Sequence, residues 1–132
     1  MLAVSIDFHG NSAEAIAFYQ KVFDATVNGV YYYHEAPPGS GVPITEETKN
    51  WVMHSELFIH GTRINICDTT EELTAGMIRL NVFFSSADEV CKTFELLKDG
   101  GKILVELSPQ FYSPMSGTLI DRFGVQWGLI AE

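Results

Sequence analysis

The sequence predicts an α+β fold built from two copies of a strand–helix–strand–strand–strand (βαβββ) module. Three observations lead to this prediction. The same order of predicted elements occurs twice along the chain. The two predicted helices open with similar tripeptides, Ser12-Ala13-Glu14 and Ser86-Ala87-Asp88, which lie 74 residues apart. Two helices can cover only one face of eight strands, so the other face must close on itself, on a ligand or on a second subunit.

Composition and length are typical of one globular domain. The chain has 132 residues, of which 46% are hydrophobic and 19% are charged. We expect a single domain over residues 1–132, with module one at about 1–70 and module two at about 76–132. No apolar run approaches the roughly 20 residues that span a bilayer. The opening residues lack the pattern of a secretion signal, so a cytoplasmic location is expected.

The charge balance argues against two classes of partner. The net charge is −9, from 17 acidic and 8 basic residues, and the basic residues are scattered. Nucleic acid binding requires clustered Lys and Arg, so we expect neither nucleic acid nor a membrane as partner. Cys67 and Cys91 lie far apart without a CxxC spacing, which favours free buried thiols over a disulfide.

The first module is expected to open with a strand that ends at the turn His9-Gly10-Asn11. In the helix that follows, Asn11 and Glu14 have capping-box spacing. Its apolar side chains fall on one face: Ile16, Tyr19, Val22 and Phe23. The expected elements are a strand at 3–8, a helix at 11–25, a strand at 25–35, a loop at 36–50, and a hairpin of strands 51–59 and 62–68 around His60-Gly61.

The second module repeats this order. Its helix has Ser86 and Glu89 at capping-box spacing, and Gly100 as its stop. Its apolar stripe is Val90, Phe94 and Leu97. The expected elements are a strand at 77–84, a helix at 85–101, a strand at 102–108, a loop at 109–117, a strand at 118–122 and a last strand at 125–131, with Trp127 in the core.

Three motifs resemble a known family. "FHGNSAEAIAFYQKVFDA", "MHSEL" and "LIDRFGVQW" resemble, in the same order, the opening, a central strand and the closing motif of PhnB-like proteins. These belong to the glyoxalase/bleomycin-resistance (vicinal oxygen chelate) superfamily. The resemblance implies a U-shaped, eight-stranded mixed sheet around a cleft, with the helices on its outer face, commonly in a homodimer. The branch often carries a methyltransferase label, but the chain has no glycine-rich strand–turn–helix segment to hold S-adenosylmethionine.

The resemblance also places the metal ligands that many superfamily members carry. The first-module His position falls on Ala3 or Val4, the second-module His position on Met77, and the last carboxylate position on Gly128. Asn65 is the nearest polar residue to the first-module carboxylate position. Because Ala, Val and Gly offer no donor and an amide is a weak one, we expect no metal and no cofactor.

His54 and Glu56 are the most suggestive pair, since a strand puts both on one face. They either order the sheet or a dimer contact, or they line the cleft as a polar anchor or general base.

Arg79 and Asn81 share a face with Met77, and by alternation Ile78, Leu80 and Val82 should face the helix. The arginine either binds a carboxylate or phosphate, or pairs with one of the acidic residues. Phe111 and Tyr112 form either an apolar lid over the cleft or ordinary surface packing.

Three functional hypotheses follow. The leading one is a metal-free PhnB-like cleft protein that binds a small organic molecule without turning it over, through residues such as His54, Glu56 and Arg79. The alternative is an enzyme of lyase, isomerase or dioxygenase type, with a relocated site that uses His54 and Glu56. A third is a structural dimer module whose cleft is filled by its own side chains.

Overall fold

The computed structural model describes residues 2–132, which form two compact units divided between Thr74 and Ala75. Each unit contains one βαβββ module, so the predicted duplication is confirmed. The first has β1 (Val4–Phe8), α1 (Ser12–Phe23), β2 (Thr26–Tyr32), a 3-10 helix η1 (Tyr33–Glu35), β3 (Val52–Ile59) and β4 (Thr62–Asp68). The second has β5 (Leu80–Phe84), α2 (Ala87–Leu97), β6 (Lys102–Gln110), β7 (Ser113–Ile120) and β8 (Gln126–Ala131).

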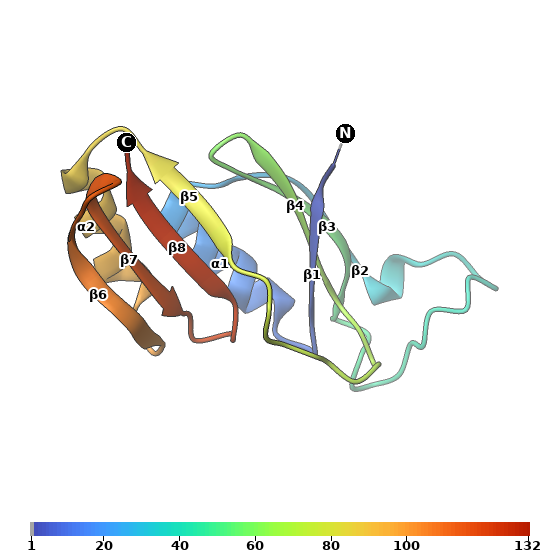
Figure 1. The fold of residues 1–132 in the computed structure, drawn as a ribbon. Coiled ribbons are helices and arrows are strands. Elements are labelled where there is room, and N and C mark those ends of the chain that lie inside the picture. The colour runs from blue at the N-terminus through green and yellow to red at the C-terminus, as the bar shows by residue number, and fades with distance from the viewer. Residues whose placement is uncertain (1) are drawn as a thin grey trace. The chain divides into compact units, whose positions relative to one another are not determined.

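The two sheets have the same topology. Their strand orders are β1-β4-β3-β2 and β5-β8-β7-β6, and in each the first pair is parallel while the other pairs are antiparallel. Figure 1 shows the order of the second sheet. The carbonyls of Phe8 and Phe84 accept equivalent 2.8 Å hydrogen bonds, from the amides of Thr69 and Glu132. Phe84 is therefore the counterpart of Phe8. The α+β class and the mixed sheets are confirmed, whereas their closure around a cleft stays a prediction.

In the first module, α1 covers one face of its sheet. The expected apolar face of α1 is buried, and it packs against β3 and β4, whose Leu57 and Ile66 are fully buried. The alternation of strand residues leaves the opposite face partly exposed and polar. This separation of faces fixes where a ligand can reach the sheet.

The start of α1 differs from the prediction. Asn11 makes no side-chain cap bond, so the expected capping box at Asn11 and Glu14 is wrong. The buried carboxylate of Asp68, at the end of β4, accepts from the amides of Gly10 and Ser12 at 2.9 and 3.1 Å. It also accepts from Ser12 Oγ at 2.7 Å and, through its other oxygen, from the amide of Val52 at 2.9 Å. An acceptor 56 residues away in sequence thus replaces the local cap.

In the second module, the helix has the expected Ser86 cap but not the reciprocal half of a capping box, because the Glu89 carboxylate accepts from Ser85 Oγ at 3.4 Å. Ser86 Oγ accepts from the amide of Glu89 at 3.2 Å. The stripe Val90, Phe94 and Leu97 is buried. Trp127 is also in the core, as expected, and its Nε1 donates to Asp121 Oδ2 at 2.9 Å.

The strand predicted at 77–84 begins only at Leu80. Because β5 pairs with β8 from Leu80 opposite Trp127, residues 77 and 78 would face the turn at 124–125 and have no strand to join. Ile78 is consequently 75% exposed, so the expectation that it faces the helix is wrong.

The loop predicted at 109–117 is a hairpin, with β6 and β7 joined by Phe111 and Tyr112. Both prolines of this segment are compatible with the hairpin. Pro109 lies on an edge strand, and Pro114 precedes the part of β7 that pairs with β8, so neither removes a bond that the sheet needs.

The remaining connections agree with the sequence. His60 and Gly61 have φ angles of 47° and 81° and close the predicted β3–β4 hairpin in a two-residue turn. Residues 36–50 contain no α-helix or strand. Between residues 2 and 132, no helix has the length and apolar character needed to cross a membrane. Cys67 and Cys91 are free, but both are only partly buried, which corrects the expectation of buried thiols.

Candidate binding face of the first module

The face of the first sheet that points away from α1 brings several polar side chains together. Glu56 on β3 lies opposite Asn65 on β4, which lies opposite Ser5 on β1. The next row includes His54 opposite Tyr31 of β2. Their neighbours Ser55 and Leu57 are fully buried on the other face. His54 and Glu56 therefore lie on the open face of the sheet and outside its core.

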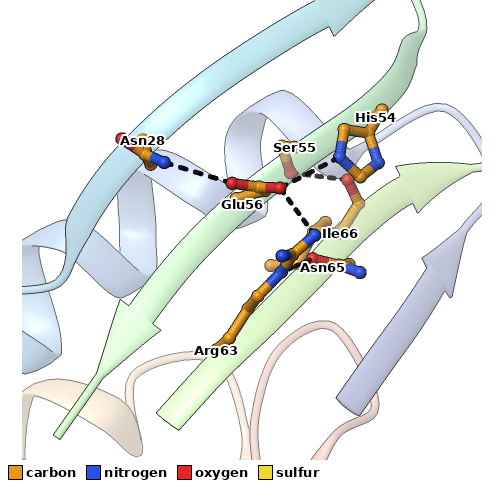
Figure 2. Close-up of polar contacts among 7 residues, drawn as sticks. All are labelled: Asn28, His54, Ser55, Glu56, Arg63, Asn65 and Ile66. Atoms are coloured by element: carbon orange, nitrogen blue, oxygen red, sulfur yellow. Dashed lines mark hydrogen bonds and ion pairs between the residues drawn. The ribbon is translucent and has the colours of Figure 1, made fainter. Parts of the chain in front are cut away.

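Glu56 is the centre of a hydrogen-bonded network on this face (Figure 2). Its Oε1 lies 2.5 Å from Arg63 Nη2 and 3.6 Å from His54 Nε2, and its Oε2 accepts from Asn28 Nδ2 at 3.2 Å. The hydrogen bond from Asn28, followed by the charges of Arg63 and His54, lowers the pKa of the Glu56 carboxyl despite partial burial. Glu56 is thus a fixed carboxylate with partners on three sides.

Arg63 extends this network to Asn65, because its Nε donates to Asn65 Oδ1 at 2.9 Å. Arg63 was not among the site residues predicted from the sequence. The two-residue turn of the predicted hairpin fixes its register and places Phe58 opposite Arg63, so Glu56 and Arg63 are diagonal neighbours. The hairpin register was therefore the signal that could have identified it.

An aromatic pair borders the network. The rings of Tyr31 and His54 are stacked, with centroids 6.4 Å apart and an interplanar angle of 23°. The Tyr31 side chain is 53% exposed and that of His54 is 44% exposed. Such a surface suits the stacking of a planar ring.

Cys67 and Asp7 continue the face toward β1. The Cys67 thiol donates to Asp7 Oδ1 at 3.0 Å. Burial, followed by the hydrogen bond to and charge of Asp7, raises the pKa of the Cys67 thiol to about 12. Because the thiolate is the nucleophilic form, Cys67 is a poor nucleophile at neutral pH.

The residues at the superfamily's ligand positions do not fit a metal. Within residues 2–132, no three or more His, Cys, Asp and Glu side chains are grouped so that they could hold an ion. The equivalence of Phe8 and Phe84 makes Arg79 the counterpart of Ala3, while Met77 lies before β5 and is 99% exposed. At Gly128, the space that a Cβ would fill is occupied by Asn81 Oδ1. No donor set converges at these positions.

The other candidates belong to the second unit. Arg79 Nε donates to Asn81 Oδ1 at 3.3 Å, and Asn81 lies opposite Gly128. Among the described residues Arg79 has no ion pair, so the interpretation that it pairs with an acidic side chain is wrong. Phe111 and Tyr112 are both exposed at the hairpin tip, where Tyr112 Oη lies 3.0 Å from Ser116 Oγ. The structure thus gathers His54, Glu56 and Asn65 in one unit; their sharing a ligand with Arg79 stays a prediction.

Comparisons with known proteins agree with this architecture. Residues 8–129 match the model of the Glyoxalase/Bleomycin resistance protein/Dioxygenase superfamily. Protein YjdN of Escherichia coli K12 is 25% identical over 137 residues, covering 96% of this chain and 91% of YjdN.

Two solved structures share the fold. A Bacillus cereus PhnB protein, described as a putative 3-demethylubiquinone-9 3-methyltransferase, is 24% identical with a TM-score of 0.82, over 99% of this chain and 98% of that one. Protein PA1353 of Pseudomonas aeruginosa is 22% identical with a TM-score of 0.87, over 100% and 97%. With its duplicated βαβββ modules and a family match over nearly its whole length, the chain belongs to the glyoxalase/bleomycin resistance protein/dioxygenase superfamily.

Proposed function

We propose that the open face of the first module binds a small organic molecule, without a metal and without turning it over. The observation that carries this proposal is the Glu56 network, in which the carboxylate is already satisfied by Arg63, Asn28 and His54. Polar groups held in place before binding lose little conformational freedom when a ligand arrives. Sequestration of a drug or metabolite would be one such role.

The surface indicates the kind of molecule. The stacked pair Tyr31 and His54 offers a flat, partly exposed surface, and the network beside it offers both hydrogen-bond donors and acceptors. A planar molecule that carries a polar group matches both features.

The same geometry disfavours turnover. A general base works best when its pKa lies near the working pH, and the pKa of Glu56 is lowered from its ordinary acidic value. Cys67 stays protonated at neutral pH. The competing enzyme hypothesis would therefore have to rely on His54, oriented by Glu56 at 3.6 Å.

The test is NMR titration of protein treated with chelator and then freed of it, with indole and 4-methylphenol as probes. We expect saturable shifts of the Tyr31 and His54 ring signals, with the probes recovered unchanged. Tyr31→Ala should lose binding. The matched control is Tyr32→Ala, because Tyr32 stacks on His34 in a second Tyr–His pair, at 5.8 Å and 3°. Shifts that survive Tyr31→Ala, or chemical conversion of a probe, would refute the proposal.

We also propose that the chain forms a homodimer. Apolar side chains elsewhere in the second unit support this, since Leu104 and Val105 on the edge strand β6 and Phe111 at the hairpin tip are exposed. Light scattering at several protein concentrations tests it, and a monomer mass throughout would contradict it.

A further inference from the structure

We propose that Arg79 and Asn81 form an oxyanion-binding site on the second module, for the carboxylate, phosphonate or phosphate group of a small molecule. Arg79 lies directly before β5, and Asn81 is the second residue of β5. The Arg79 Nε–H group donates to Asn81 Oδ1 at 3.3 Å, so the amide holds the plane of the guanidinium through one of its five N–H donors. The donors on the two terminal nitrogens remain for another acceptor.

Gly128 makes this arrangement possible. It lies opposite Asn81 in the β5–β8 pair, and Asn81 Oδ1 occupies the space that a side chain at residue 128 would need. A Cβ at Gly128 would also lie 3.5 Å from Arg79 Nε. The glycine therefore leaves room for the amide beside the guanidinium.

A comparison of the three arginines shows why Arg79 is available. Arg63 Nε donates to Asn65 Oδ1 in the same way, but Arg63 Nη2 also contacts Glu56 at 2.5 Å. Arg122 Nη2 contacts Asp99 at 2.7 Å. Arg79 has no carboxylate partner within residues 2–132, although the chain has 17 acidic residues.

An oriented guanidinium that has no carboxylate partner within the chain has the geometry to bind the carboxylate of a ligand. Two parallel N–H···O bonds join the planar fork to a carboxylate, phosphate or phosphonate. The Glu56 carboxylate contacts a terminal nitrogen of Arg63, whereas no carboxylate within residues 2–132 contacts those of Arg79.

The test follows the Nε–Hε signals of all three arginines by NMR, at constant ionic strength adjusted with sodium chloride. Acetate and methylphosphonate are titrated separately. We expect the Arg79 signal to move saturably with at least one of them, while the Arg63 and Arg122 signals move much less. Saturation with acetate alone assigns a carboxylate ligand, and saturation with methylphosphonate alone assigns a phosphonate or phosphate; both results support the site. If the Nε–Hε signals of all three arginines drift equally and without saturation, the proposed site at Arg79 is overturned.

Variants separate the site from general charge effects. In Arg79→Gln the Asn81 side-chain amide signal serves as the reporter, and its saturable shift on addition of the anion should be lost; in Arg122→Gln, which removes the same charge elsewhere in the second unit, the saturable shift should remain. Asn81→Ala should weaken anion affinity about three- to tenfold, because it removes one hydrogen bond that orients the guanidinium. An unchanged anion affinity in Asn81→Ala would show that the Asn81 amide does not orient the Arg79 guanidinium. The shift of the Arg79 signal does not depend on the aromatic probes that test Tyr31. Anion binding at Arg79 and the binding of a planar molecule at Tyr31 and His54 can therefore each fail without the other.

Discussion

The two modules share a topology but anchor their helices differently. In the first, Asp68 at the end of β4 accepts four hydrogen bonds and ties the start of α1 to β3. The equivalence of Phe8 and Phe84 makes Ala131 the counterpart of Asp68, and Ala131 has no side-chain acceptor. In the second module Ser86 caps α2 locally. The same backbone unit can thus be held by a long-range junction or by a local cap.

The polar faces of the modules differ in a similar way. Arg63 and Arg79 are both braced by an asparagine two residues later in the chain. Only Arg63 also has a carboxylate, that of Glu56. The charge of Arg63 is therefore paired within its module, while that of Arg79 has no carboxylate partner among residues 2–132.

The largest effect is expected from Asp68→Ala. It leaves the part-buried donor of Gly10 and the buried donors of Ser12 and Val52 without their acceptor, which should lower the free energy of unfolding by about 3–5 kcal/mol. Asp68→Asn keeps one acceptor oxygen and should cost less. Urea unfolding measures the free energy of unfolding of both variants. If Asp68→Ala loses no more of it than the removal of a local cap does, the four hydrogen bonds of Asp68 do not stabilise the fold as proposed.

Ser86→Ala is the matched change in the second module. It removes one cap bond to the amide of Glu89, and should lower the free energy of unfolding by about 1 kcal/mol. The same urea experiment gives the value. If Ser86→Ala lowers the free energy of unfolding as much as Asp68→Ala does, the two modules do not differ in how strongly the start of the helix is anchored.

A smaller effect is expected at Cys67. With a pKa of about 12, only about one thiol in ten thousand is ionised at pH 8, so alkylation by iodoacetamide should be slow. Asp7→Asn removes a negative charge beside the thiol and leaves a neutral acceptor in place of a charged one, and should speed the reaction. Peptide mass spectrometry follows the modification of Cys67 alone, and equal rates in the two proteins would contradict the role of Asp7.

The smallest effect is expected at Glu56. Because its pKa in the folded protein is lowered, the stability that its network adds is present above the ordinary carboxyl pKa and is lost as pH falls through the lowered value. The carbon signal of its carboxyl group should therefore titrate below the ordinary range, about pH 4.3. In Arg63→Gln the midpoint should rise, and an unchanged midpoint would show that Arg63 does not stabilise the carboxylate.

Periodicity and turn residues were sufficient to predict the fold. The apolar faces of both helices, the His60-Gly61 hairpin and the duplicated order follow from local pattern, because each depends on residues close in sequence. The start of β5 and the β6–β7 hairpin were missed, because both depend on where a partner strand ends.

The polar face around Glu56 was less predictable than the fold, because its contacts also depend on strand register and on residues far apart in sequence. Alternation placed His54 and Glu56 on one face, but the contact with Arg63 requires the hairpin register. Asp68 joins residues 56 positions apart, and the strand pattern of "TRINICD" contains no signal of that junction. That Arg79 has no carboxylate partner between residues 2 and 132 likewise depends on where the acidic side chains lie in the folded chain.

Metal analysis of protein purified without chelator shows whether the open face of the first module, which carries His54 and Glu56, works without an ion. We expect zinc, nickel, iron and manganese each far below one equivalent per chain, and no selective broadening of the His54 signals when manganese is added. One equivalent of a metal that disappears in His54→Ala would contradict the account.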